Sequence, residues 1–318
     1  MNVDEVSALA AKVRAEIGKA IVGQTETVDL LLTALFARGH VLLEGAPGTA
    51  KTFLAQCFAR TLDLDFGRIQ FTPDLMPADI IGANLFNFQT SSFTLSKGPL
   101  FCELLLADEI NRTPPKTQAA LLEAMQERQV TIDGKPHVLS DRFMVVATQN
   151  PLEQQGTYPL PEAQLDRFLF KQTLGYPSRD EERRIVATYG VQSGQTAPAD
   201  MGVAKVVNAK VLAAANAAVA AVTLSDEVVT YVLDLVRSTR ETADLQSGAS
   251  PRSAAQLALA ARARAALDAR DYVIPDDVKA LALPVLRHRV ILSPAAEIEG
   301  RRADEVIQGL VERAAAPR

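Results

Sequence analysis

Hydrophobic positions follow two different patterns before and after about residue 176. Up to that residue, short apolar runs typical of buried strands alternate with segments whose apolar residues recur at helical spacing. This alternation indicates a parallel sheet flanked by helices, because parallel strands need a helical crossover between them. The apolar runs that we interpret as strands begin at Val41, Phe66, Leu104, Phe143 and Phe168.

After that point the pattern is helical and rich in alanine, and strand signal is nearly absent. Residues 178–181 form a capping-box signature, and the polar stretch at 192–200 predicts a linker or loop. Further helices are expected at 208–220, 226–240, 252–268 and 276–283, with a terminal helix at 297–313. We therefore predict an α/β domain over residues 1–176 and an all-α domain over residues 177–318.

Two segments of the first part predict β-hairpins. Residues 85–95 place apolar and aromatic positions on both sides of a polar turn at 89–92. Residues 130–139 surround the pair Asp133-Gly134, which is a strong turn signal. The aromatic residues of the first hairpin either pack on the domain or contact a partner, and the sequence leaves both readings open.

The strand that begins at Val41 leads into a glycine-rich loop and then a helix. The loop reads Gly45-Ala46-Pro47-Gly48-Thr49-Ala50-Lys51-Thr52. Such a loop binds phosphate, because its N–H groups and the helix N-terminus point at the anion. Lys51 would reach the β- and γ-phosphates of a nucleotide, and the Thr52 hydroxyl would ligate Mg²⁺. Ala50 stands where this pattern usually has glycine, so a positive φ there would carry mild strain.

Polar residues also end two later apolar runs. Asp108 and Glu109 follow the run that begins at Leu104, in the positions where one acid holds the Mg²⁺ shell and the next polarises the attacking water. Asn150 follows the run that begins at Phe143. Its amide would contact the γ-phosphate or that water, although by itself it is equally a turn residue before proline.

Arg252 falls in the first turn of a helix that begins after Ser250. The helix dipole disfavours a free cation at this end, so a bound anion would explain the arginine. An ordinary surface arginine is the alternative.

Composition narrows the class of partner. The chain has 318 residues with 48% hydrophobic and 22% charged residues, as is ordinary for a soluble globular protein. The formal net charge of −5 argues against a dominant nucleic-acid-binding surface. The three histidines His40, His137 and His288 lack metal-ligand spacing, so no zinc site is predicted.

Cys57 and Cys102 lie within apolar segments, which predicts buried thiols in a reducing compartment. The chain starts with acidic residues and without an apolar core, unlike a signal peptide, and its longest apolar run is too short to span a membrane. We therefore expect a cytoplasmic protein.

Taken together, the loop, the paired acids, the asparagine and the helix-start arginine resemble the motifs of an AAA+ ATPase. Longer runs of residues resemble the MoxR family in particular, and this resemblance covers the chain from about residue 15 to 315. Alanine in place of glycine at position 50 is itself a MoxR-like feature. The matching runs are residues 45–52, 107–112, 123–127, 147–151 and 156–168.

The resemblance implies a P-loop AAA+ core followed by a helical lid, with ATP and Mg²⁺ as cofactors. The hairpins at 85–95 and 130–139 resemble the helix-2 and pre-sensor-1 insertions of this clade, which usually face the pore or axial surface of a ring. The implied roles are Walker A for Lys51 and Thr52, Walker B for Asp108 and Glu109, sensor 1 for Asn150, sensor 2 for Arg252, the arginine finger for Arg167, and the adenine border for Val22 and Gly23.

The family also implies an assembly. AAA+ proteins of this kind form rings, usually hexamers, in which the finger of one subunit, here Arg167, completes the ATP site of its neighbour. MoxR proteins are regarded as chaperone-like and often work with a partner that carries a von Willebrand factor A domain, maturing client proteins or inserting metals or cofactors. Two alternatives share the motifs: a nucleic-acid motor or transcription-activating ATPase, and a chelatase-type motor subunit.

Overall fold

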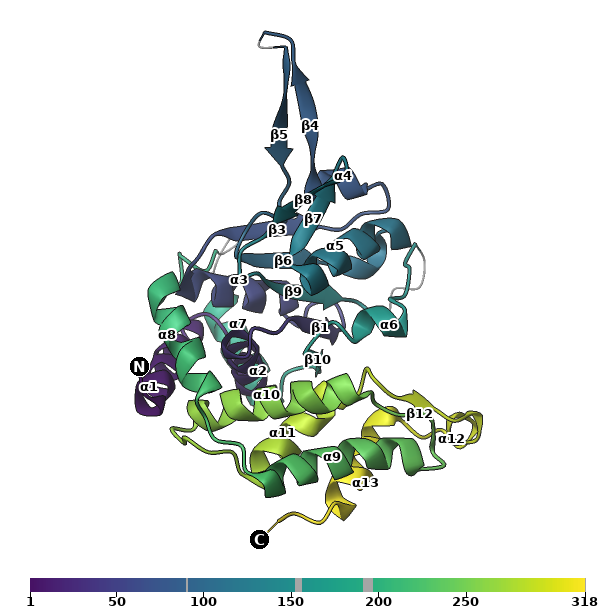
Figure 1. The fold of residues 1–318 in the computed structure, drawn as a ribbon. Helices are drawn as coiled ribbons and strands as arrows, with labels where there is room; N and C mark the ends of the chain where they lie inside the picture. Colours follow the sequence, from purple (N-terminus) through teal and green to yellow (C-terminus); the bar gives the residue numbers. More distant parts are fainter. Residues whose placement is uncertain (90, 152–155, 191–196, 318) are drawn as a thin grey trace.

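The computed structural model describes residues 1–89, 91–151, 156–190 and 197–317 (Figure 1). Residue 90 of the first predicted hairpin turn and residues 192–196 of the predicted linker lie outside the described residues.

A five-stranded parallel sheet forms the centre of the first part, in the order β10-β1-β9-β6-β3. The strands are β1 (Val41–Gly45), β3 (Phe66–Gln70), β6 (Leu104–Asp108), β9 (Met144–Gln149) and β10 (Phe170–Leu174). All five predicted strands are confirmed, although β10 starts at Phe170 rather than Phe168. Because β1, β9 and β6 are neighbours and parallel, their carboxyl ends lie together at one edge, where α/β sheets bind ligands.

Helices flank this sheet. They are α1 (Val3–Ile17), α2 (Thr25–Phe36), α3 (Lys51–Thr61), α4 (Pro77–Ile81), α5 (Pro115–Glu127), α6 (Glu162–Leu165) and α7 (Arg179–Tyr189). The predicted capping box at the start of α7 is present, since the Ser178 side chain accepts from the Glu181 N–H and the Glu181 carboxylate from the Ser178 N–H. The sheet and helices α1 to α6 confirm the α/β prediction for this part, and α7 lies beyond residue 176, in the part predicted to be helical.

Both predicted hairpins form, but their surroundings differ. Strands β4 (Gly82–Asn87) and β5 (Ser92–Lys97) pair and project from the sheet, whereas β7 (Gln129–Ile132) and β8 (Lys135–Val138) pair close to it (Figure 1). Near the tip of the first hairpin, Phe88 is 86% exposed and Phe93 is 70% exposed. The reading in which these aromatic rings pack on the domain is therefore wrong for these two residues.

The second part is largely helical, as predicted. Its helices are α8 (Ala209–Ala220), α9 (Asp226–Glu241), α10 (Pro251–Leu267), α11 (Pro275–Leu286), α12 (Pro294–Ile298) and α13 (Ala303–Arg313). The prediction of one terminal helix from 297 to 313 is wrong, because the chain turns between α12 and α13 with Gly300 at a φ of +73°. Helix α11 runs past Pro284 to Leu286, three residues beyond the predicted end.

Two short strand pairs were not predicted. In one, β2 (Leu62–Asp63) runs parallel to β11 (Val207–Asn208), and in the other β12 (Leu245–Ser247) runs antiparallel to β13 (Ile291–Leu292). Strands of two or three residues are too short to show a period in the sequence. The first pair ties the start of the helical part to the end of α3.

One apolar cluster spans the predicted domain boundary. It joins buried residues of α1 and α2, such as Val6 and Leu31, with those of α10, such as Leu257. A second cluster, around Leu121 and Phe143, includes residues of α5 and the sheet. The division at residue 176 stays a prediction, and the helical part packs against the first two helices along a continuous core.

Cys57 and Cys102 are buried and free, and burial raises the pKa of each thiol to about 12. They are small core residues, as predicted. Within the described ranges, no helix is long and apolar enough to cross a bilayer.

Candidate nucleotide-binding site

The glycine-rich loop connects the end of β1 to the start of α3. Ala50, the residue before the helix, has a φ of 61°, so the positive φ considered for this position is present. An added Cβ at Gly45 would lie 2.8 Å from the Leu174 carbonyl oxygen of β10, so the close approach of the two strands requires glycine there. Pro47 and Gly48 are exposed, and Thr49 is buried with its hydroxyl donating to the Ala46 carbonyl.

Lys51 curls over this loop. Its ammonium group donates to the carbonyl oxygens of Gly45 at 2.6 Å and Ala46 at 2.8 Å. Burial lowers the pKa of Lys51, and the nearby carboxylates Asp108 and Glu109 oppose that shift. A cation at the N-terminal end of α3 thus faces the same loop whose N–H groups suit an anion.

A hydroxyl network links the loop to the paired acids. Thr52 Oγ1 donates to Asp108 Oδ1 at 2.8 Å, and Thr148 Oγ1 donates to the same oxygen at 2.6 Å. Thr148 also accepts from the Glu109 N–H at 2.9 Å. Hydroxyl and carboxylate oxygens are the ligands that Mg²⁺ prefers, so Thr52 and Asp108 fit a magnesium ion.

Thr148 was not predicted as a site residue. It closes an apolar run, and its part in fixing both acids follows only from the pairing of β9 with β6.

Two side chains of β3 contact the acids and were also not predicted. Arg68 Nη2 lies 3.0 Å from Asp108 Oδ2, and Gln70 Nε2 donates to Glu109 Oε2 at 2.9 Å. Residues two apart on a strand point to the same face. Arg112 Nε lies 3.1 Å from Glu109 Oε2 as well. The second acid of the pair is therefore held by an amide and a guanidinium.

Asn150 immediately follows β9 and is buried. The backbone carbonyl of Asn150 accepts a hydrogen bond from Asn111 Nδ2 at 3.1 Å. Since β9 lies between the loop strand β1 and the acid strand β6, Asn150 is placed at the same sheet edge as the loop and the acids.

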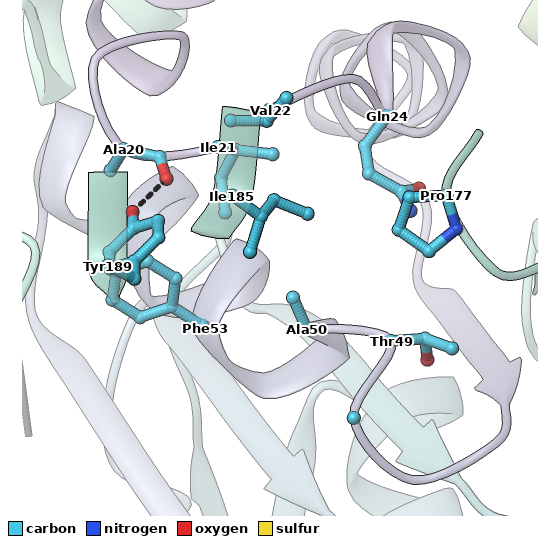
Figure 2. Close-up of a pocket in the computed structure, with 11 residues that line it drawn as sticks. Ala20, Ile21, Val22, Gln24, Thr49, Ala50, Phe53, Pro177, Ile185 and Tyr189 are labelled. Carbon is cyan, nitrogen blue, oxygen red and sulfur yellow. Dashed lines mark hydrogen bonds between the residues drawn. The ribbon is translucent and has the colours of Figure 1, made fainter. Parts of the chain in front are cut away.

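Next to the loop lies a mostly apolar cavity of about 330 Å³ (Figure 2). Val22 and Ala50 line it, as do Thr49 and Gly48 of the loop. Gly23 is not among the lining residues, and an added Cβ there would lie 2.1 Å from Glu181 Oε1. The remaining lining residues are Ala20, Ile21, Gln24, Phe53, Pro177, Ile185 and Tyr189.

The wall of this cavity joins α3 to α7. The Tyr189 hydroxyl donates to the Ala20 carbonyl, and the ring packs edge-on to Phe53 with centroids 6.3 Å apart. Sequence reasoning missed Phe53 and Tyr189, because nothing local marks two residues so far apart in the chain as neighbours. An apolar cavity beside a phosphate loop suits a flat heteroaromatic base.

The two predicted functional arginines are held by other elements. Arg167, just after α6, donates to Gln126 Oε1 at 3.0 Å and to the Ala163 carbonyl at 3.2 Å. Arg252, in the first turn of α10, lies 3.6 Å from Asp166 Oδ2. The structure thus groups Lys51, Thr52, Asp108, Glu109 and Asn150 at the sheet edge, whereas Arg252 contacts Asp166, the residue before Arg167.

Arg289 was missed by sequence reasoning. Its side chain is 1% exposed and binds Asp166 Oδ1 at 2.7 Å, the Phe168 carbonyl at 2.6 Å and the Leu169 carbonyl at 3.2 Å. Burial lowers its pKa to about 10, although Asp166 opposes the shift. The neighbouring His288 is buried with Nε2 3.0 Å from the Phe168 oxygen, and burial lowers its pKa.

The sheet with its phosphate loop, paired acids and following helical domain defines an AAA+ ATPase. The profile of the "ATPase family associated with various cellular activities (AAA)" matches residues 40–170, and that of the "AAA lid domain" matches residues 237–310. The crystal structure of a protein from Cytophaga hutchinsonii that is proposed to be an ATPase superposes on this chain with a TM-score of 0.88. The two chains are 40% identical, and the superposition covers 99% of this chain and 98% of that one.

Relatives of similar length narrow the class. "Chaperone MoxR1" of Mycobacterium tuberculosis is 44% identical over 95% of this chain and 81% of its own length, and "Protein MoxR" of Methylorubrum extorquens is 32% identical over 97% and 95%. "Uncharacterized protein YeaC" of Bacillus subtilis is 43% identical over 99% and 97%. The chain belongs to the MoxR family of AAA+ ATPases.

Proposed function

We propose that this MoxR-family ATPase binds ATP with Mg²⁺ at the loop of residues 45–52 and hydrolyses it to remodel or activate a client protein. The observation that carries the proposal is the network in which Thr52 and Thr148 both donate to Asp108 beside the Lys51 loop. Bound Mg²⁺, held by Thr52 and Asp108, would supply positive charge against the negative charge that develops on the phosphate in hydrolysis.

Each residue has a distinct task in this account. Lys51 exchanges its two loop carbonyls for phosphate oxygens, and Thr52 with Asp108 holds the magnesium ion, partly through water. Glu109 orients and polarises the attacking water, with Asn150 at the adjacent strand end positioning the γ-phosphate or that water. The apolar cavity lined by Val22, with Gly23 at its border, receives the adenine.

We also propose that the site is completed between subunits of a ring, with a hexamer as the expected size. Arg167 is held by Gln126 and Ala163 rather than by residues of its own phosphate loop. This arrangement supports a role as the arginine finger of a neighbouring site, where a guanidinium stabilises transition-state charge. Arg252, in the first turn of α10, would contact the nucleotide of its own subunit.

The projecting hairpin supports a role in client or partner contact. Phe88 and Phe93 are largely exposed, and large exposed apolar side chains that lie together mark interaction sites. A partner with a von Willebrand factor A domain, and clients that receive a metal or cofactor, are the candidates that the family suggests. Capture of bound proteins by Glu109→Gln in ATP, with and without Phe88→Ser, tests this contact: loss of capture supports it, and undiminished capture contradicts it.

The nucleotide site is tested by two substitutions with opposite effects. Lys51→Ala should abolish ATP binding, because it removes the cation that contacts the phosphates, whereas Glu109→Gln should bind ATP and fail to turn it over. Lys205→Ala serves as the control, since Lys205 pairs with Asp63 on the surface. Hydrolysis at wild-type rates by both site variants would show that the site is assigned wrongly.

A further inference from the structure

Asp166 precedes Arg167 in the chain and contacts Arg252. We propose that Asp166 is a positioning residue that couples one nucleotide site to the next around the ring. Through Asp166, the movement of Arg252 onto the nucleotide of its own subunit would alter the segment that presents Arg167 to the neighbour. This inference rests on the proposed function, in which Arg252 and Arg167 serve different sites.

The first half of the argument is a fixed ion pair. Arg289 is almost fully buried, and Asp166 is the carboxylate that pairs with it, at 2.7 Å. Removing one partner of a buried pair leaves an uncompensated charge, which is strongly destabilising. Asp166 therefore stays on Arg289, and Arg289 in turn holds the carbonyl oxygens of Phe168 and Leu169. The buried contacts of segment 166–169 with the helical domain thus include this guanidinium and His288.

The second half is a releasable ion pair on the same carboxylate. Arg252 lies 3.6 Å from Asp166 Oδ2 and is 48% exposed. Exposed ion pairs of this length contribute little to stability, so Arg252 can leave at low cost for a stronger anion. Phosphate oxygens of a bound nucleotide provide such an anion.

The consequence concerns Arg167. Its side chain is held by two hydrogen bonds, to Gln126 and Ala163, and its backbone position depends on the anchored segment. When Arg252 departs, Asp166 balances one guanidinium instead of two, and its Oδ2 becomes free to shift toward Arg289. The charge around segment 166–169 then differs between a subunit with bound nucleotide and one without it. Because Arg167 belongs to this segment, that difference would change how Arg167 contacts the neighbouring site.

Mixed rings separate the two sides of one interface. A donor subunit carrying Glu109→Gln supplies an intact Arg167 but cannot hydrolyse, and an acceptor carrying Arg167→Ala hydrolyses only with a finger supplied by a donor. Asp166→Asn is then added to the donor in one mixture and to the acceptor in another. Asparagine keeps the size of the side chain and an oxygen for Arg289, and thermal unfolding checks that each variant folds.

The expected result is an asymmetry. Asp166→Asn in the donor should lower the activity of the mixture about tenfold, because a misplaced finger loses transition-state contact. In the acceptor, Asp166→Asn should lower the maximal rate less than about twofold. The half-saturating ATP concentration should fall by at most about fivefold, because the Asp166 carboxylate no longer competes weakly with the nucleotide for Arg252. Asp304→Asn is the matched control: it removes the carboxylate partner of Arg287, another guanidinium of the helical domain, and should act equally on both sides.

A second variant avoids the buried pair. Arg252→Gln in the donor alters an exposed side chain, and it should lower the Hill coefficient of the mixture for ATP toward one, because the donor's nucleotide no longer changes the contacts of Asp166. Equal losses on both sides for Asp166→Asn, or a Hill coefficient that Arg252→Gln leaves unchanged, would overturn the coupling. A parent mixture that is inactive at every ratio would instead overturn the shared site of the proposed function, and this inference with it.

Discussion

Two regions of the molecule are built in different ways. We call them the phosphate end, which is the loop of residues 45–52 with Asp108 and Glu109, and the arginine end, which is Asp166 with Arg167, Arg252 and Arg289. At the phosphate end, Lys51, Thr52 and Asp108 make their contacts with residues of their own loop and of adjacent strands. At the arginine end, Arg289 is held by several short contacts, whereas the ion pair of Arg252 with Asp166 is longer, at 3.6 Å. The phosphate end is held by contacts within its own loop and between neighbouring strands. The arginine end combines a buried anchor, Arg289, with a half-exposed cation, Arg252, that can be released.

This difference fits the proposed function, in which one subunit presents only part of a catalytic site. In that proposal the phosphate end holds the groups that would bind a nucleotide and activate water. The cation that would complete the transition-state contacts, Arg167, is oriented by α5 and α6 instead. Three variants perturb the two ends separately, and a change of pH tests the buried histidines.

The largest effect is expected at the phosphate end from Asp108→Asn. The change removes the charge that would hold magnesium and that accepts from Thr52 and Thr148, and we expect turnover to fall about a thousandfold. Steady-state ATP hydrolysis measures this, with Asp141→Asn, at an exposed acid, as the control. Turnover within a few-fold of wild type would show that Asp108 does not hold the metal.

At the arginine end, Arg289→Met should mainly affect stability. It leaves Asp166 and the carbonyls of Phe168 and Leu169 without their buried donor, and we expect the free energy of unfolding to fall by about 3 kcal/mol. Urea unfolding of the two proteins measures this difference. Arg301→Met removes the half-exposed partner of Asp244 and should cost at most about 1 kcal/mol. Equal losses for the two variants would mean that Arg289 is not an anchor.

Thr148→Val tests the hydroxyl between the two acids. The substitution keeps the shape of the side chain but leaves the Glu109 N–H without its acceptor and Asp108 with one donor fewer. We expect about a tenfold loss of turnover, corresponding to about 1.4 kcal/mol. Thr33→Val, which removes a hydroxyl bond within α2, is the matched control and should leave turnover unchanged.

Acidification should lower the free energy of unfolding by a smaller amount, through two buried histidines. Burial lowers the pKa of His40, at the start of β1, to about 4, and lowers that of His288 as well. The unfolded chain therefore binds more protons below its own histidine pKa of about 6.5, and stability falls as pH falls from there toward 4. At pH 5.5 the loss from His40 should be about 1.4 kcal/mol.

Unfolding of wild type and His40→Gln at pH 7.5 and 5.5 measures the His40 contribution. The Nδ1 atom of His40 accepts from the Val145 N–H, which a protonated ring cannot do, whereas glutamine retains both a donor and an acceptor. The variant should therefore lose less stability on acidification, and equal losses in the two proteins would contradict the assignment.

Features with a local signal were predictable from the sequence. The loop, the strands and both hairpins each carry their pattern within about a dozen residues, and the loop motif raised the question of a positive φ at Ala50, which the structure has. Thr148 gave no such signal, because a threonine at the end of an apolar run is ordinary in a strand.

What the sequence did not reveal depends on packing between distant segments. Tyr189 meets Phe53, and Arg289 meets Asp166, only once the helical domain has folded onto the sheet. The break before α13 is different, because it carries a local signal that the prediction overlooked: residues 299–302 are charged or glycine, and Gly300 has a positive φ just after α12.

The central claim, that each ATP site is shared by two subunits, is tested most directly by mixing Glu109→Gln and Arg167→Ala proteins and measuring ATP hydrolysis across the full range of ratios. Each protein alone should be nearly inactive. The mixtures should regain activity with a maximum near equal proportions, because only an interface with an intact Glu109 on one side and an intact Arg167 on the other is complete. Activity that never exceeds the sum of the separate proteins would contradict the account.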